Sequence, residues 1–160
     1  MVGEADRDRL IAEVAALYEW IDAQTRQHAA RAGRCNACGA CCDFTTYDHR
    51  LFVTPPELIY LAARLNAKEL RQMTSGRCPY QEGKNCMVHA HRFASCRIFC
   101  CKGDDAFQNE LSEAALKKLK AICERFQIPY RYRELGSALR CFSSDTCQSA
   151  EAPCPADREG

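Results

Sequence analysis

The sequence has little net charge and no long apolar run. It contains 22 Lys and Arg against 21 Asp and Glu in 160 residues, which gives a formal net charge of +1. Nucleic-acid-binding domains usually carry a marked basic excess. The apolar runs are only a few residues long, whereas a membrane-spanning helix needs about 20. We therefore expect no nucleic-acid partner and no membrane contact, and an unknown protein partner stays open.

Familiar targeting and catalytic motifs are also missing. Residues 1–7 read MVGEADR, a charged stretch without the apolar segment of a secretory signal. A cytoplasmic location is the resulting expectation. We find no glycine-rich phosphate loop and no Ser-His-Asp arrangement. Whether the protein is an enzyme is therefore uncertain from sequence.

Cysteine, by contrast, is abundant. The chain has 13 cysteines, an odd number. In a reducing cytosol such thiols stay reduced, so a dense cluster indicates metal binding or catalysis rather than disulfides. A secreted disulfide-bonded protein is the alternative. Thiol–disulfide exchange is not favoured, because the strand–helix context of thioredoxin-like motifs is missing.

Apolar periodicity predicts a mainly α fold with a single domain over residues 1–142. Residues 5–32 are predicted to form one long amphipathic helix ending at Gly33. The apolar positions that define its buried face are Leu10, Val14, Leu17 and Ile21. Further helices are predicted from the Thr54–Glu57 capping box to Leu65 and over 66–76, 104–126 and 133–142. Residues 143–160 have no apolar pattern and are predicted to be a disordered tail.

The cysteines concentrate in two segments without helical periodicity, 35–42 and 78–101. In the second segment, Gly83-Lys84-Asn85 predicts the turn of a short β-hairpin, across which Cys78 and Cys86 could face one another. The expected fold is therefore a small, irregular, metal-stabilised domain whose helices pack around two cysteine-rich loops.

The first segment has the spacing of a metal site. Cys35, Cys38 and Cys41 follow a C-x2-C-x2-C pattern, which bacterial ferredoxins combine with a more distant cysteine before proline. Cys78-Pro79 supplies such a residue. Zinc can be held by four thiolates of the same kind. We predict an iron–sulfur cluster or zinc at these four cysteines, with the triple favouring iron–sulfur.

Three further cysteines are assigned to the same or an adjacent centre. Neighbouring side chains point in different directions, so Cys41 and Cys42 seldom serve one tetrahedral ion together. The additional predicted metal ligands are Cys42, Cys86 and Cys96. The groups that could complete a second site, and whose role stays open, are Cys100, Cys101, His49 and His89.

The remaining charged and cysteine residues have simpler interpretations. Four arginines lie beside or close to the cysteines and could offset thiolate charge: Arg34, Arg77, Arg92 and Arg97. Cys123 lies within an apolar helical stripe, so core packing is its expected role, and Cys141 is similar.

The cysteine segments also resemble a known family. Residues 35–42 read CNACGACC and are similar to the CxxCGxCC (CxxCxxCC) signature of the YkgJ-type cysteine-cluster proteins, described as a zinc- or iron-chelating domain. The resemblance continues through CPY at 78–80, CMVH at 86–89, Arg92 and CRIF at 96–99, so the motif core spans 35–99.

Flagellin lysine N-methylases look like distant members of this family. That resemblance implies the alternative function, a metal-dependent protein-modifying enzyme. The chain departs from the family pattern at His89, where tyrosine is usual, and at Phe93, where proline is usual. Both departures lie away from the cysteines, so they weaken an inherited partner or substrate more than an inherited metal.

Overall fold

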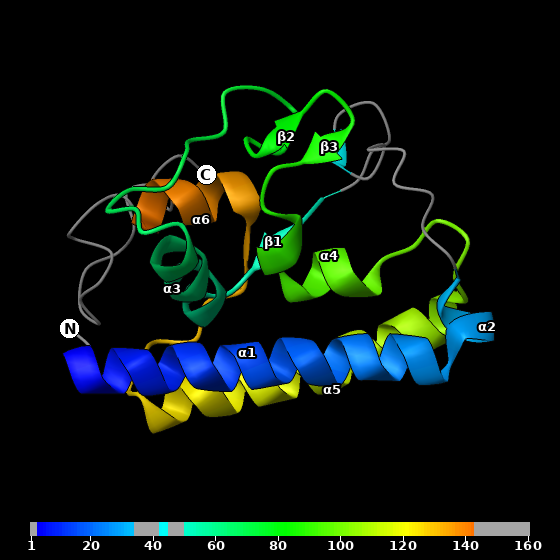
Figure 1. Ribbon diagram of the computed structural model, residues 1–160, viewed down its shortest axis with the longest axis horizontal. Helices are drawn as coiled ribbons and strands as arrows, with labels where there is room; N and C mark the ends of the chain where they lie inside the picture. Colours follow the sequence, from blue (N-terminus) through cyan, green and yellow to red (C-terminus); the bar gives the residue numbers. More distant parts are fainter. Residues whose placement is uncertain (1–2, 34–41, 45–49, 143–160) are drawn as a thin grey trace.

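The structure, a computed structural model, describes residues 3–33, 42–44 and 50–142 (Figure 1). Its helices are α1 (Glu4–Gln27), α2 (Ala29–Ala32), α3 (Pro55–Arg64), the 3₁₀ turn η2 (His89–His91), α4 (Ala94–Ile98), α5 (Asp105–Arg125) and α6 (Leu135–Phe142). Its strands are β1 (Phe52–Val53), β2 (Gln81–Glu82), β3 (Asn85–Cys86) and β4 (Arg133–Glu134). The predicted mainly α fold class is confirmed.

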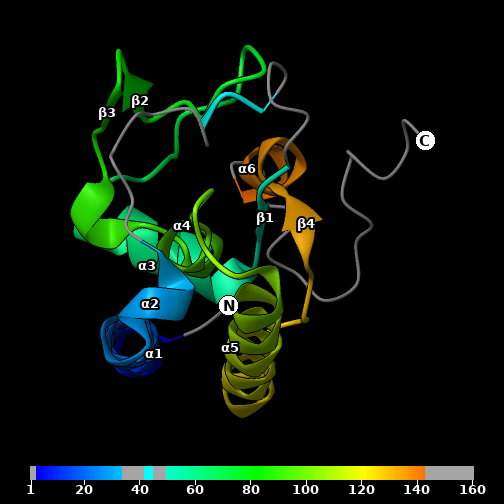
Figure 2. The same ribbon diagram turned by 90° about the vertical axis from the view of Figure 1, so that its right-hand side faces the viewer.

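Helices α1 and α5 form one layer of the molecule, lying side by side in opposite directions (Figures 1 and 2). The single helix predicted over 5–32 is interrupted at His28, whose φ of −115° and ψ of 40° separate α1 from α2. Helix α5 begins where predicted, because the Asp104 side chain accepts a hydrogen bond from the Phe107 N–H at 3.0 Å and caps the helix.

The first hydrophobic core lies between this layer and the helices above it. All four apolar positions predicted for the buried face of the first helix are at most 5% exposed. The core residues are Leu10, Val14, Leu17, Tyr18, Ile21, Ala32, Tyr60, Ala94, Ile98, Phe107, Leu111, Ala115, Leu119 and Ile122. Regular 3.6-residue periodicity therefore accounts for most of this core.

A second core lies under α3, α6 and the short strands. β1 pairs antiparallel with β4, so that Phe52 is opposite Glu134 and Val53 opposite Arg133. The buried residues of this core are Leu51, Val53, Leu58, Leu61, Ala62, Leu70, Cys78, Tyr80, Val88, Phe93, Leu135, Ala138 and Leu139. Six of the thirteen follow helical spacing within α3 and α6, and the other seven come from short or irregular segments.

Two predicted helices differ from the structure. No helix forms over 66–76, because Asn66 takes a left-handed φ of 50° and the Ala67 N–H bonds back to the Ala62 carbonyl, which ends α3. The chain then bonds elsewhere, with the Arg71 N–H donating to the Tyr80 hydroxyl at 3.0 Å. The last helix starts at Leu135 rather than 133, because residues 133–134 form β4.

The predicted hairpin is present as the antiparallel pair β2–β3, with Gly83 at a positive φ of 62° in the turn. Its register places Cys86 opposite Gln81 rather than opposite Cys78. Within the described ranges, no helix combines the length and apolar character needed to cross a membrane.

Candidate metal centre

An antiparallel bridge between Asp43 and Arg77 joins the two cysteine-rich segments directly. The Cys78 N–H donates to the Cys42 carbonyl at 2.9 Å, and the Phe44 N–H donates to the Gly76 carbonyl at 2.8 Å. The end of the first segment is thus fixed beside the start of the second. Two cysteines that are distant in sequence become backbone neighbours.

The same bridge carries an ion pair. Arg77 Nη2 lies 3.2 Å from Asp43 Oδ2, and the Asp43 side chain is only 13% exposed. Arg77 is one of the arginines expected to offset thiolate charge, and it lies next to Cys78 in the chain. Its charge is shared with Asp43, so its effect on a neighbouring thiolate is reduced.

Four of the predicted ligands gather at the second core. Cys78 is a buried member of it, and the half-buried residues packed against it include Cys42, Cys86 and Cys96. None of these four cysteines is in a disulfide. The other three predicted ligands (Cys35, Cys38 and Cys41) lie outside the described residues, as does His49.

The described residues do not form a complete site by themselves. Among residues 3–33, 42–44 and 50–142, no three His, Cys, Asp or Glu side chains are placed to hold one ion. A centre at this position therefore depends on the C-x2-C-x2-C segment, which directly precedes Cys42 in the sequence.

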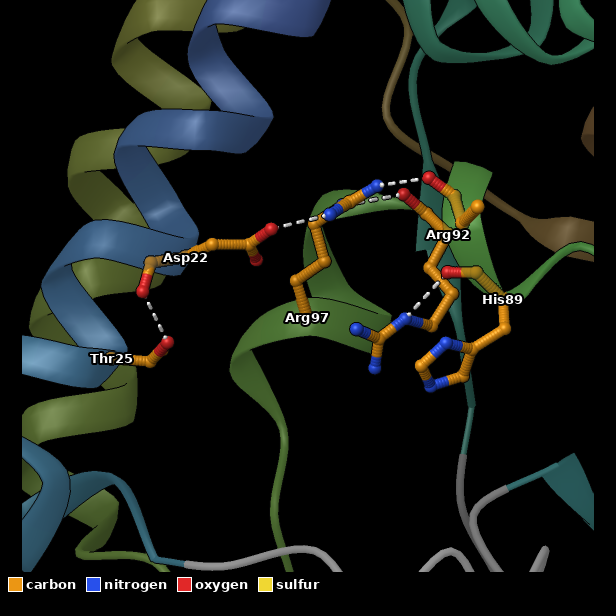
Figure 3. A network of polar contacts seen from close by, with 6 residues as sticks. Asp22, Thr25, His89, Arg92 and Arg97 are labelled. Atoms are coloured by element: carbon orange, nitrogen blue, oxygen red, sulfur yellow. Dashed lines mark hydrogen bonds and ion pairs between the residues drawn. The ribbon is translucent and has the colours of Figure 1, made fainter.

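The short helix α4 carries Cys96 and is held against α1 by the next residue, Arg97 (Figure 3). Arg97 Nη1 donates to Asp22 Oδ2 at 2.8 Å, Nε donates to the Arg92 carbonyl at 2.9 Å, and Nη2 donates to the Ala90 carbonyl at 3.1 Å. The guanidinium also lies 4.3 Å from the ring centroid of Tyr18. Its side chain is 7% exposed. Arg97 therefore positions α4 on α1, and these contacts give no support to its predicted role beside a thiolate.

Glu57 is the second anchor of α4, and its tertiary role was not predicted from the sequence. Its Oε1 accepts from the Ala94 N–H at 2.7 Å and from the Tyr18 hydroxyl at 3.3 Å. Its Oε2 accepts from both the N–H and the hydroxyl of Thr54 at 3.0 Å. One carboxyl group thus joins α1, α3 and α4, and its side chain is almost fully buried.

Burial dominates the electrostatics of this carboxyl group. Removal from water raises the pKa of Glu57, and the bonds from Ala94 and Thr54 oppose the shift only in part. The same desolvation, together with the nearby Glu57, raises the pKa of Tyr18 well above its usual value. The capping box was visible in the sequence, but no local signal shows that its glutamate faces two other helices.

The remaining described cysteines differ in environment. Cys123 is 1% exposed in α5, which confirms its predicted core position, and burial raises the pKa of its thiol to about 11. Cys100 is buried and Cys101 is exposed. Whether either of them binds a metal stays open. Cys141 is buried as expected but takes part in a disulfide.

The histidines of the second segment lie on η2. His89 is exposed, and Arg92, followed by partial burial, lowers its pKa. His91 Nδ1 is buried and has no hydrogen-bond partner among the described residues. Burial, followed by Arg64 and Arg97, lowers the pKa of His91. Both shifts favour neutral imidazole, the form that binds metals.

Close backbone packing fixes where the first cysteine segment starts. Gly33 has a φ of 77°, and a Cβ there would lie 2.8 Å from the Lys102 carbonyl carbon. A Cβ on Gly103 would lie 2.6 Å from the Ala32 carbonyl oxygen. These contacts require glycine at both positions. They place Gly33 against Lys102 and Gly103, which directly follow Cys100 and Cys101.

Comparison of the chain with protein-family models, curated proteins and solved structures finds no match to any of them.

Proposed function

We propose that this protein binds a metal through clustered cysteine thiolates, as an iron–sulfur cluster or as zinc. Cys35, Cys38, Cys41 and Cys78 form one site. The other proposed ligands, in the same or an adjacent centre, are Cys42, Cys86 and Cys96. The sequence resemblance to the YkgJ-type family supports the same assignment.

The observation that carries the proposal is the pairing of residues 42–44 with 76–78. The hydrogen bond from the Cys78 N–H to the Cys42 carbonyl places a distant cysteine beside the last residue of the CNACGACC segment. A C-x2-C-x2-C triple needs such a fourth ligand. A bridge of only two or three residues holds two distant segments together weakly. A metal bound by cysteines of both segments would hold them more firmly.

The donor set suits both metals. Thiolate sulfur is a preferred ligand of zinc and of iron–sulfur clusters. An iron–sulfur cluster would supply electron transfer, sensing or cluster handling, whereas zinc would act structurally and support a partner-binding surface. The C-x2-C-x2-C triple favours iron–sulfur.

Metal and sulfide analysis tests the proposal. The protein is purified without oxygen, its visible spectrum is recorded, and iron, zinc and acid-labile sulfide are measured per chain. A brown protein with similar amounts of iron and sulfide supports a cluster. A colourless protein with one or two zinc ions supports a structural zinc site. Absence of both metals from a folded protein would overturn the proposal.

Two cysteine variants locate the centre. Cys78→Ser is expected to lose most of the metal, because it removes the ligand that links the two segments. Cys123→Ala is the matched control: its thiol is buried within α5, and its raised pKa keeps it protonated. Equal metal loss in both variants would indicate general destabilisation rather than loss of a ligand.

A further inference from the structure

A cavity of about 1020 Å³ lies at the end of the molecule where α1 begins. It is bordered by the first turns of α1, by α3, by the chain that follows α5 and by α6. No residue of 42–44 or of 76–101 lines it. The cavity is therefore separate from the candidate metal centre, and an inference about it stands independently of the proposed function.

The floor of the cavity is apolar. It is formed by side chains from α1, α3 and the chain that follows α5: Ile11, Leu58, Ile59, Ala62, Phe126 and Ile128. Small-molecule sites are mostly apolar hollows with a few polar groups that fix orientation, and their volumes extend to about 1,000 Å³. In size and lining this cavity fits that description.

The rim of the cavity is mainly cationic. Lys68 lies in the segment after α3 and Arg131 in the segment after α5. Arg7 and Arg133 add two further positive charges, whereas the carboxylates of the rim are on Glu4 and Asp8. Among the described residues, no ion pair or side-chain hydrogen bond engages Arg7, Lys68 or Arg131. The four cations exceed the two carboxylates, so the rim has a net positive charge that a bound anion would offset.

The backbone after α5 directs the arginines toward the cavity. Residues 133 and 134 form β4, and successive side chains of a strand point to opposite sides. Arg131 and Arg133 line the cavity, whereas Tyr130 and Tyr132 do not and are 38% and 42% exposed. The Tyr132 ring instead packs on Phe52, with ring centroids 5.2 Å apart. The alternation of tyrosine and arginine thus gives the cavity a cationic wall.

We propose that this cavity binds an anionic amphiphile, a single-chain carboxylate whose apolar body lies on the floor and whose head group meets Lys68 and Arg131. Burial of the ligand's hydrocarbon tail on the apolar floor accounts for the affinity of that tail. The positive charge of the rim selects a carboxylate over a neutral head group.

Calorimetric titration of the full-length protein as purified tests this proposal. The probes are decanoate and decan-1-ol, both below their aggregation limits. Decanoate is expected to bind saturably, and decan-1-ol about tenfold more weakly, because a tenfold change corresponds to about 1.4 kcal/mol of head-group interaction. This comparison uses the unaltered protein and so does not depend on a variant folding.

Paired charge variants locate the head group. The double variant Lys68→Ala/Arg131→Ala is expected to bind decanoate about tenfold more weakly and decan-1-ol unchanged. The matched control is Lys117→Ala/Lys120→Ala, which removes two exposed charges of α5 that do not line the cavity. Equal decanoate affinity in both double variants, equal affinity for the two probes, or no saturable binding would overturn the proposal. A concentration-dependent dimer that the first double variant abolishes would also overturn it and assign the cavity to a second copy of the chain.

Discussion

The layer of α1 and α5 and the cysteine layer (residues 42–44, 50–98 and 133–142) are held together in different ways. Helix α1 has 24 residues and α5 has 21, and each presents a periodic row of buried apolar side chains. The four named strands of the cysteine layer have two residues each, and its core residues come from many short segments. The periodic apolar faces of two long helices hold the first layer together. The second layer is held together by contacts between distant parts of the chain.

Besides the apolar contacts of the second core, some of the links between distant parts of the chain are polar. Residues 42–44 meet 76–78 through one bridge, and α4 is fixed by Arg97 on Asp22 and by Glu57 on the Ala94 N–H. A two-residue strand pair buries little area and contributes little stability alone. Thiolate ligation, if the centre is as proposed, would add further bonds to this layer.

Metal removal is expected to have the largest effect and to separate the two layers. If the centre is as proposed, chelation should lower the free energy of local opening over 76–98 by roughly 5 kcal/mol, part of the ~10–16 kcal/mol with which structural zinc binds zinc-finger peptides. Amide hydrogen exchange with and without the metal measures this change.

The helices provide the internal control for that experiment. Amides in the middle of α1 and α5 should keep most of their protection, because the first core contains none of the proposed ligands. Unchanged exchange over 76–98 after the metal is removed would contradict the dependence of this layer on metal. Uniform loss across the chain would contradict the separation of the layers.

Leu119→Ala should have the next largest effect and act on the opposite layer. Leu119 is 0% exposed in the first core, so truncation leaves a cavity and is expected to lower the free energy of unfolding by about 3 kcal/mol. Urea unfolding measures it, and metal per folded chain should not change. The exposed Lys120→Ala variant on the same helix should stay within about 0.5 kcal/mol of the wild type. A loss of metal in Leu119→Ala would show that the two layers are coupled.

The same contrast explains what the sequence could predict. The spacing of Leu10, Val14 and Leu17 predicts a buried helix face, because helical periodicity is a local property of the chain. The Asp104 cap and the Gly83 turn are local in the same sense, and both were located. The break at His28 was missed, since no glycine or proline marks it.

The features that the sequence could not predict depend on distant partners. Nothing near Cys42 indicates that its carbonyl accepts from Cys78, and nothing near Glu57 indicates that Ala94 donates to it. Residues 66–76 carried a capping signal, but a left-handed Asn66 and bonds to Tyr80 overrode it. The predicted ligands Cys35, Cys38 and Cys41 lie outside the described residues, so their assignment remains a prediction.

Glu57→Gln should have the smallest effect. It tests the contact that Glu57 makes between the two layers, through the pH dependence of the free energy of unfolding. The pKa of Glu57 is raised in the folded protein, chiefly by burial. At pH values between the usual pKa and the raised one, the folded state therefore holds a proton that the unfolded state has lost. The unfolding free energy of the wild type then falls as pH rises through this window, with a slope of at most about 1.4 kcal/mol per pH unit for one proton. Glutamine does not titrate, so the variant lacks this slope.

The measurement is urea unfolding of both proteins from pH 4 to 7.5, and the difference between them cancels the other titrating groups. The advantage of the wild type should be largest near pH 4 and shrink as pH rises. Leu119→Ala, which removes no titrating group, should show a constant difference from the wild type over the same range. The opposite trend in Glu57→Gln, a wild-type advantage that grows with pH, would mean that the hydrogen bonds from Ala94, Thr54 and Tyr18 outweigh burial. The pKa of Glu57 would then be lowered in the fold, and a buried carboxylate would hold α4 on the helical layer.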